Sequence, residues 1–174
     1  MILFLTIIAC LAISSISYAQ PYGKGIYNSN VPYGSQTSLS IATNGNISVP
    51  ITPVTGGALA TGTSIITITS TDVIGYKLYI KALTSTSMNN LGTLLPASAN
   101  GTPVALTVNT WGYNTDASAN FTGITITDAL IRSATLPAST GEITNVTYGM
   151  NLDLAKPAGN YVANVVYTAV PQTN

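Results

Sequence analysis

The sequence predicts an all-β fold: an antiparallel two-sheet β-sandwich, of the Ig-like or Greek-key kind, with about seven or eight strands. Two observations support this prediction. Ser and Thr occupy 42 of the 174 positions, in short stretches that alternate apolar with polar residues, which is the period of a strand with one buried face. Gly, Pro, Asn and Asp separate these stretches at short intervals, and no stretch has the period of a three-turn helix.

The first 19 residues predict a secretory signal peptide. A largely apolar run from Ile2 to Ile13 is followed by small residues up to Ala19, which is the order of an apolar core and a cleavage site. No Lys or Arg precedes the run, so the match is imperfect, and the apolar run is long enough that an uncleaved anchor remains an alternative. Ile7-Ile8-Ala9-Cys10 resembles a lipobox with an acylated Cys10, but the missing cation and the apolar residues beyond Cys10 favour a cysteine within the apolar core of the signal peptide. We expect cleavage, which makes the mature chain extracellular or cell-surface, without a cysteine and therefore without disulfides.

After the signal peptide, residues 20–35 are rich in Gly, Pro, Asn and Tyr without any period, and they predict a flexible leader. Regular alternation starts beyond it, and residues 36–174 predict one β-sandwich domain. A chain of this length supports one domain with a substantial core.

The domain opens with two predicted strands. Leu39 and Ile41 alternate with Ser and Ala, and Ile47, Val49 and Ile51 alternate with Ser48 and Pro50. Because proline cannot donate to a ladder, the second strand should lie at a sheet edge or end at its prolines. These five apolar residues are the ones we expect to take part in strand donation to another molecule.

The middle of the domain predicts three strands. A run from Ser64 to Thr71 leads through a turn into residues 76–82, where Tyr76, Leu78 and Ile80 should face the core and the two lysines between them should face solvent. A loop-rich segment over 84–103 precedes a predicted strand at 104–108, which ends near a Trp-Gly-Tyr corner.

The last third contains the clearest pattern. Ile124 and Ile126 predict a short strand, and residues 129–136 are ambiguous between a strand and one helical turn. Two long alternating arms, at 146–154 and 161–170, flank a Pro-Ala-Gly-Asn sequence. The sequence predicts that these arms pair as a hairpin.

Three segments resemble secreted bacterial surface β-sandwiches. They are the sequence from Ser70 to Ile80, the Trp111-Gly112-Tyr113 corner, and the closing Lys156-Pro157-Ala158-Gly159-Asn160-Tyr161 stretch that continues to Thr168. These segments are similar to WxL-like cell-surface domains and to fimbrial or spore-coat-U-like domains. The resemblance implies an extracellular, all-β, structural or adhesive protein. Neither Trp111-Gly112-Tyr113 nor Tyr167-Thr168-Ala169 matches Trp-x-Leu, so the resemblance does not carry peptidoglycan binding.

The composition excludes most kinds of catalytic site. The chain has no His, and its one Cys lies in the signal peptide, so the usual nucleophile triads are excluded and a zinc site would need carboxylates alone. The five acids, which could form a glycosidase pair, are predicted to be solvated turn residues. A polar loop at 114–120 spaces oxygen side chains as calcium loops do, but it has only one carboxylate. We therefore expect no enzyme activity, no cofactor and no metal.

The distribution of charged residues limits the classes of partner that the protein could bind. Five scattered cations balance five anions, which excludes the clustered basic surface of a nucleic-acid-binding protein. No membrane association is expected once the signal peptide is removed. A neutral surface does not resist self-association, so the expected partner is a second copy of the chain or another cell-surface component.

Two non-enzymatic functions remain. The first is a self-assembling filament subunit, pilus-like or matrix-like, joined by N-terminal strand donation. The alternative is a module that binds cell wall or polysaccharide through Trp111 and Tyr113, if these rings are exposed. A tryptophan that fills the core at that corner is an equally open interpretation.

Overall fold

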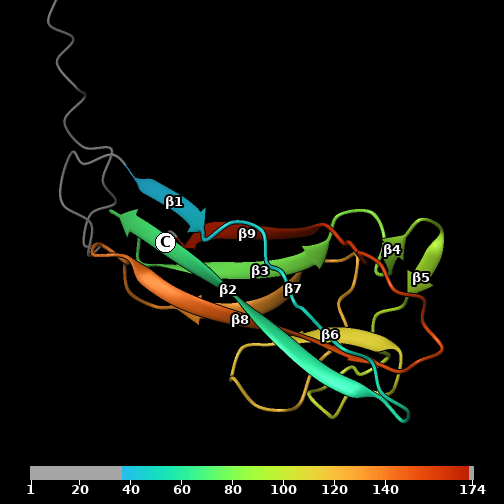
Figure 1. The fold of residues 1–174 in the computed structure, drawn as a ribbon. Helices are drawn as coiled ribbons and strands as arrows, with labels where there is room; N and C mark the ends of the chain where they lie inside the picture. The colour runs from blue at the N-terminus through green and yellow to red at the C-terminus, as the bar shows by residue number, and fades with distance from the viewer. Residues whose placement is uncertain (1–36, 173–174) are drawn as a thin grey trace, which may run out of the picture.

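The computed structural model describes residues 37–172, so the predicted signal peptide and leader lie outside the described residues. Within that range the chain forms nine strands and no helix (Figure 1), which confirms the predicted all-β class. The strands are β1 (Ser38–Thr43), β2 (Ala58–Thr71), β3 (Gly75–Ala82), β4 (Met88–Asn90), β5 (Thr93–Leu95), β6 (Thr110–Asn114), β7 (Ala129–Ala134), β8 (Glu142–Leu152) and β9 (Val165–Gln172).

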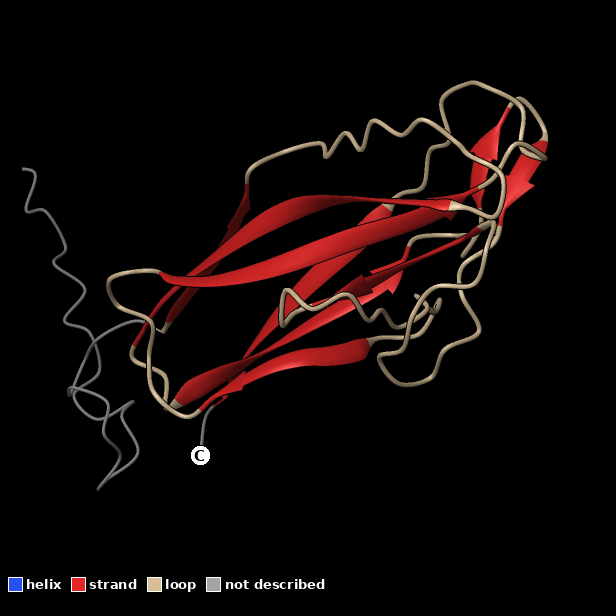
Figure 2. Ribbon diagram, turned by 60° about the horizontal axis from the view of Figure 1, so that its bottom comes forward, coloured by secondary structure: helices blue, strands red, loops and turns tan. Residues whose placement is uncertain are grey.

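The strands form two main antiparallel sheets and a small hairpin. One sheet has the order β1-β2-β8-β6, the other has the order β7-β3-β9, and β4 pairs with β5. Strands and their connecting loops make up all of the described chain (Figure 2). The two main sheets run alongside each other (Figure 1), an arrangement consistent with a β-sandwich.

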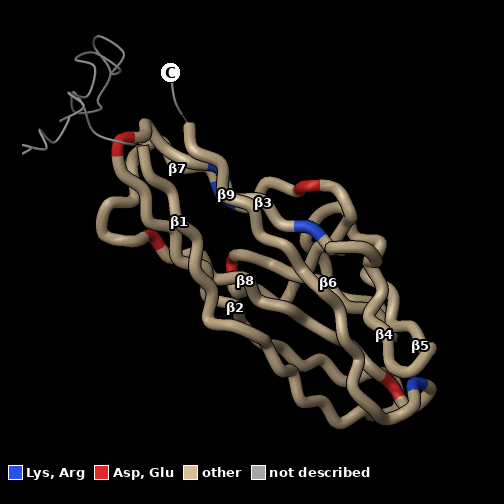
Figure 3. Tube along the Cα trace, turned by 90° about the horizontal axis from the view of Figure 1, so that it is seen from above, with Lys and Arg blue, Asp and Glu red and all other residues tan. Residues whose placement is uncertain are grey.

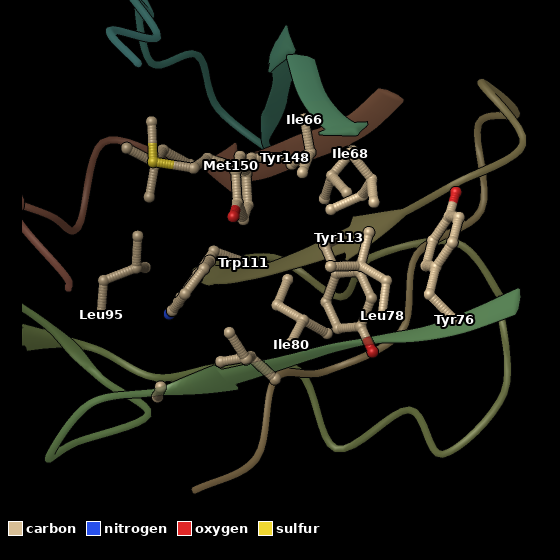
Figure 4. Close-up of a cluster of buried hydrophobic side chains, with 14 of the residues drawn as sticks. Ile66, Ile68, Tyr76, Leu78, Ile80, Leu95, Trp111, Tyr113, Tyr148 and Met150 are labelled. Carbon is tan, nitrogen blue, oxygen red and sulfur yellow. The ribbon is translucent and has the colours of Figure 1, made fainter. Parts of the chain in front are cut away.

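One cluster of buried side chains joins the two main sheets (Figure 4). Ile66 and Ile68 of β2 and Leu78 and Ile80 of β3 are fully buried in it. In β3 the buried residues alternate with half-exposed Lys77, Tyr79 and Lys81, as the sequence predicted. Removing this much aliphatic surface from water is the main stabilising contribution in a chain without disulfides.

The predicted closing hairpin is wrong. β8 pairs with β2 and β6, whereas β9 pairs with β3 in the other sheet. Residues 153–164 carry the chain from one sheet to the other instead of forming a tight turn. Alternation gave the buried side of each arm correctly, but it contains no information about which strand each arm pairs with.

Three further predicted strands are absent: the segments at 47–51, 104–108 and 124–126 have no ladder. Ile47, Val49 and Ile51 still alternate in burial with exposed Ser48 and Pro50, so their period reflects packing on one side without strand pairing. Val104 makes a single bridge to Phe121. The ambiguous segment at 129–136 forms a strand, β7, rather than a helical turn.

Lys, Arg, Asp and Glu positions are sparse along the described chain (Figure 3). Lys81 forms an ion pair with Asp128, with 3.2 Å between Nζ and Oδ1. Arg132 of β7 forms an ion pair with Glu142 of β8, and Tyr76 of β3 donates a hydrogen bond of 2.5 Å to the same carboxylate. Because β8 belongs to one sheet and β3 and β7 to the other, this cluster ties the two sheets together.

Candidate functional site

β2 is paired along only part of one edge. β1 covers residues 66–71 of β2, and Asn44 extends the contact by one step: its backbone N–H donates to the Ile65 carbonyl at 3.2 Å, and its Oδ1 accepts from the Ile65 N–H at 3.0 Å. Among the described strands, none pairs with residues 58–65 on this side. The first half of β2 therefore has an open edge.

The segment that links β1 to β2, residues 44–57, is here called the strap. It forms no strand, and it packs on β2 at Gly62. A Cβ built at Gly62 would lie 2.8 Å from both Ile47 Cγ2 and Val49 Cγ2, which is closer than carbon atoms approach without displacement. Gly62 thus forms a notch that receives these two side chains of the strap.

A cleft opens between the strap and the chain leading into β9. Its volume is about 560 Å³, and four aromatic residues from four segments line it: Trp111, Tyr148, Tyr161 and Tyr167. Ile47 and Val49 of the strap form part of its wall, and no lining residue is charged. We call this space the aromatic cleft.

Two tyrosine hydroxyls meet across the sheets at this cleft. The Tyr148 and Tyr167 hydroxyl oxygens lie 2.5 Å apart. Burial is the largest cause that raises the pKa of Tyr148, and the nearby Tyr167 raises it further. Burial also raises the pKa of Tyr167 above the ordinary tyrosine value, although hydrogen bonds from Tyr148 and Ser64 oppose it. Both hydroxyls therefore stay protonated near neutral pH, and they offer neutral donors and acceptors.

The two predicted ligand-contact residues lie in the core rather than on the surface. Trp111 and Tyr113 belong to β6, with 1% and 7% of their surface exposed. The indole of Trp111 donates from Nε1 to the Thr86 carbonyl at 2.9 Å, and its ring centroid lies 6.3 Å from that of Tyr148 (Figure 4). Trp111 reaches only the floor of the aromatic cleft, and Tyr113 does not line it.

The segment proposed for strand donation is divided by the structure. Leu39 and Ile41 lie in β1, paired within the same chain, whereas Ile47, Val49 and Ile51 lie in the strap. Sequence reasoning missed Gly62 as the position where the strap meets β2. A glycine within a strand pattern was the available signal for a close approach.

The acidic residues do not assemble into a site. Asp128 pairs with Lys81, Glu142 with Arg132, and Asp153 accepts from Asn109 at 2.8 Å. Over residues 37–172, no group of three or more His, Cys, Asp or Glu side chains could hold a metal ion.

The calcium-like loop is closed by an amide. Asn114 Nδ2 donates to the Ser118 and Asn120 carbonyl oxygens, both at 2.9 Å. Asp116 Oδ1 accepts from the Ser118 N–H, and this hydrogen bond is the largest cause that lowers the pKa of Asp116. An N–H group occupies the position where a cation would need oxygen atoms, so the loop is stabilised by its own hydrogen bonds.

Comparison with known proteins found no match: no family model, no curated protein and no solved structure is similar to this chain. None of the described segments is a helix long and apolar enough to span a membrane.

Proposed function

We propose that this chain is a non-enzymatic secreted or cell-surface structural protein whose copies assemble by exchanging the N-terminal strand β1. The observation that best supports this proposal is the position of β1. It lies at the outer edge of its sheet, it is the first described strand, and the strap connects it to everything that follows.

Backbone pairing attaches β1 along its whole length, whereas its side chains are buried only in part, with Leu39 packed against the core cluster. Ile41 and its cross-strand partner Ile68 share one face of the sheet, yet Ile41 is 40% exposed and Ile68 is fully buried. The β1 strand of a second copy would restore the same ladder in the same register. Exchange of identical segments therefore costs little free energy in the final state.

The strap supplies the reach that exchange requires. Its 14 residues (44–57) can extend over as much as about 46 Å, at roughly 3.3 Å per residue. Besides the Gly62 notch and the contacts of Asn44, the strap is held by Val49 and Ile51, which pack against the core cluster, so exchange must open these contacts. Release of the strap would let β1 reach the β2 edge of a neighbour.

Composition supports the same proposal. The net charge is zero, so copies do not repel each other as they approach. The apolar N-terminal segment with small residues before Gln20 supports export from the cell.

A disulfide placed across the β1–β2 pair tests the proposal. Ser38 and Thr71 are cross-strand partners whose hydroxyl oxygens lie 2.7 Å apart, close enough for a disulfide between cysteines at these positions. The double variant S38C/T71C of the mature chain is oxidised at high and at low concentration and run on a non-reducing gel. If β1 exchanges, the concentrated sample gives a ladder of covalently linked multimers.

The matched control is T63C/T147C. These hydroxyls are also cross-strand partners, 3.2 Å apart, but they join β2 to β8, which do not separate in this scheme. The control should give only intrachain disulfides at every concentration. Exclusively monomeric S38C/T71C in concentrated protein would overturn the proposal.

A module binding cell wall through exposed Trp111 and Tyr113 has less support, because both rings are buried.

A further inference from the structure

Strand exchange gives the aromatic cleft no role of its own, although the strap that would be released forms part of the cleft wall. The cleft volume of about 560 Å³ falls within the range of sites for small organic ligands. Its residues come from the strap, from six strands (β1, β2, β4, β6, β8 and β9) and from the chain before β9. These segments are far apart in the sequence, so the cleft depends on the complete fold.

The rings of the cleft provide apolar surface at two depths. Trp111 and Tyr148 lie at the floor and are almost fully buried. Tyr161 and Tyr167 are only half-buried, so parts of their rings face the opening. Aromatic surface of this kind favours ligands with flat apolar faces.

The polar groups of the cleft are all neutral. The Tyr148–Tyr167 hydroxyl pair lies deep, and Asn46 and Asn164 stand exposed at the rim, where each amide offers donors and an acceptor. A charged ligand would lose hydration without meeting an opposite charge. A purely aliphatic ligand would leave the deep hydroxyls without partners other than each other.

A ligand that suits this lining is neutral, has an apolar face for the rings and has several hydroxyls for the amides. Saccharides combine these properties, because C–H groups cover the face of a pyranose ring and hydroxyls surround its edge. We propose that the aromatic cleft binds one or two units of a neutral saccharide, with Tyr161 stacking on a sugar ring and Asn46 and Asn164 bonding its hydroxyls.

Ligand binding can be followed by the fluorescence of Trp111, because it is the only tryptophan in the chain and it lines the cleft. Its fluorescence is followed while the mature protein is titrated with cellobiose, maltose and di-N-acetylchitobiose, up to millimolar concentrations. We expect a saturable change with at least one of these sugars. Y161A should weaken that binding at least tenfold, and Y161F, which keeps the ring, should retain it.

Tyr79 supplies the matched control. It is also a half-exposed tyrosine in the described fold, but it lies on β3 and does not line the cleft. Y79A should bind as the unchanged protein does. The titration is made on the oxidised S38C/T71C monomer, in which β1 and the strap stay with their own chain, so the outcome is independent of strand exchange. The proposal fails if none of the sugars binds, if 1-octanol alone produces the fluorescence change, or if Y161A binds as tightly as Y79A.

Discussion

The hydroxyl oxygens of Tyr148 on β8 and Tyr167 on β9 lie 2.5 Å apart and join the two sheets. Together with buried Tyr113, whose pKa is raised first by burial and then by the neighbouring Tyr167, they form a group of three tyrosines that the fold keeps protonated. A single pair of residues therefore links the packing of the sheets to the lining of the aromatic cleft.

This tyrosine group predicts a loss of stability at alkaline pH. The folded-state pKa of Tyr148 is raised above the ordinary value of 10.0, so below about pH 9 its hydroxyl is protonated in both the folded and the unfolded state. At higher pH the unfolded chain ionises first, and the free energy of unfolding falls by up to about 1.4 kcal/mol per pH unit for this residue. Urea denaturation between pH 7 and pH 11.5 measures the loss.

The variant Y148F should remove that part of the alkaline slope. At neutral pH it should cost about 1 kcal/mol, because it breaks the hydrogen bond to Tyr167. The unchanged protein and Y148F should therefore approach each other in stability as the pH rises. Parallel pH profiles for the two proteins would contradict this account.

The Gly62 notch predicts a second effect. In G62A the added Cβ would lie 2.8 Å from Ile47 and from Val49, so the strap must shift, at a cost of about 1–3 kcal/mol. Denaturant titration measures the cost. In the S38C/T71C background, G62A should also increase the proportion of intermolecular disulfides, because a displaced strap releases β1 more readily.

A control for this substitution is available at Gly101, where an added Cβ meets no atom within 4 Å and the backbone is not in the left-handed region. G101A should change stability by less than about 0.5 kcal/mol. If G62A is equally neutral, the strap does not pack on β2 in solution as the structure describes.

Residues of β3 and of the strap show how far alternation could predict this fold. The period in the sequence correctly identified Tyr76, Leu78 and Ile80 as buried and correctly marked one side of the strap. It could not say that the strap lacks a ladder, because pairing depends on a partner strand that is distant in the sequence. The buried side of a segment is a local property, whereas its hydrogen-bonded neighbours are not.

Trp111 and Tyr113 show the same limit at the candidate site. Their Trp-Gly-Tyr sequence is typical of either a core strand or an exposed corner. What decides it is the placement of β6, which pairs with β8 so that both rings join the core cluster. The Thr122 carbonyl lies 2.6 Å from where a Cβ of Gly112 would be, so the opposite side of β6 is covered as well. No local pattern predicts that residues 121–122 fold back over β6.

Replacing Gly149 should have a large steric effect, because this residue of β8 faces Phe121. A Cβ at this position of β8 would lie 2.5 Å from Cε1 of Phe121, whose ring is fully buried and cannot move aside into solvent. We expect G149A to cost about 3 kcal/mol, near the upper limit for overpacking. Thermal or denaturant unfolding measures it, and G101A again serves as the control. A cost below about 1 kcal/mol would mean that the Phe121 loop is not held against β8.

The cross-strand pair Ile41 and Ile68 tests how firmly β1 is attached. The two residues face the same side of the sheet, but Ile41 is 40% exposed and Ile68 is fully buried. I68A should therefore cost about 2–5 kcal/mol, which is typical of a buried isoleucine, and I41A should cost less than about 1 kcal/mol. Two-state denaturant titration compares them. Equal costs for the two variants would show that β1 is packed as part of the core, and strand exchange would then require breaking a stable contact instead of a loosely covered edge.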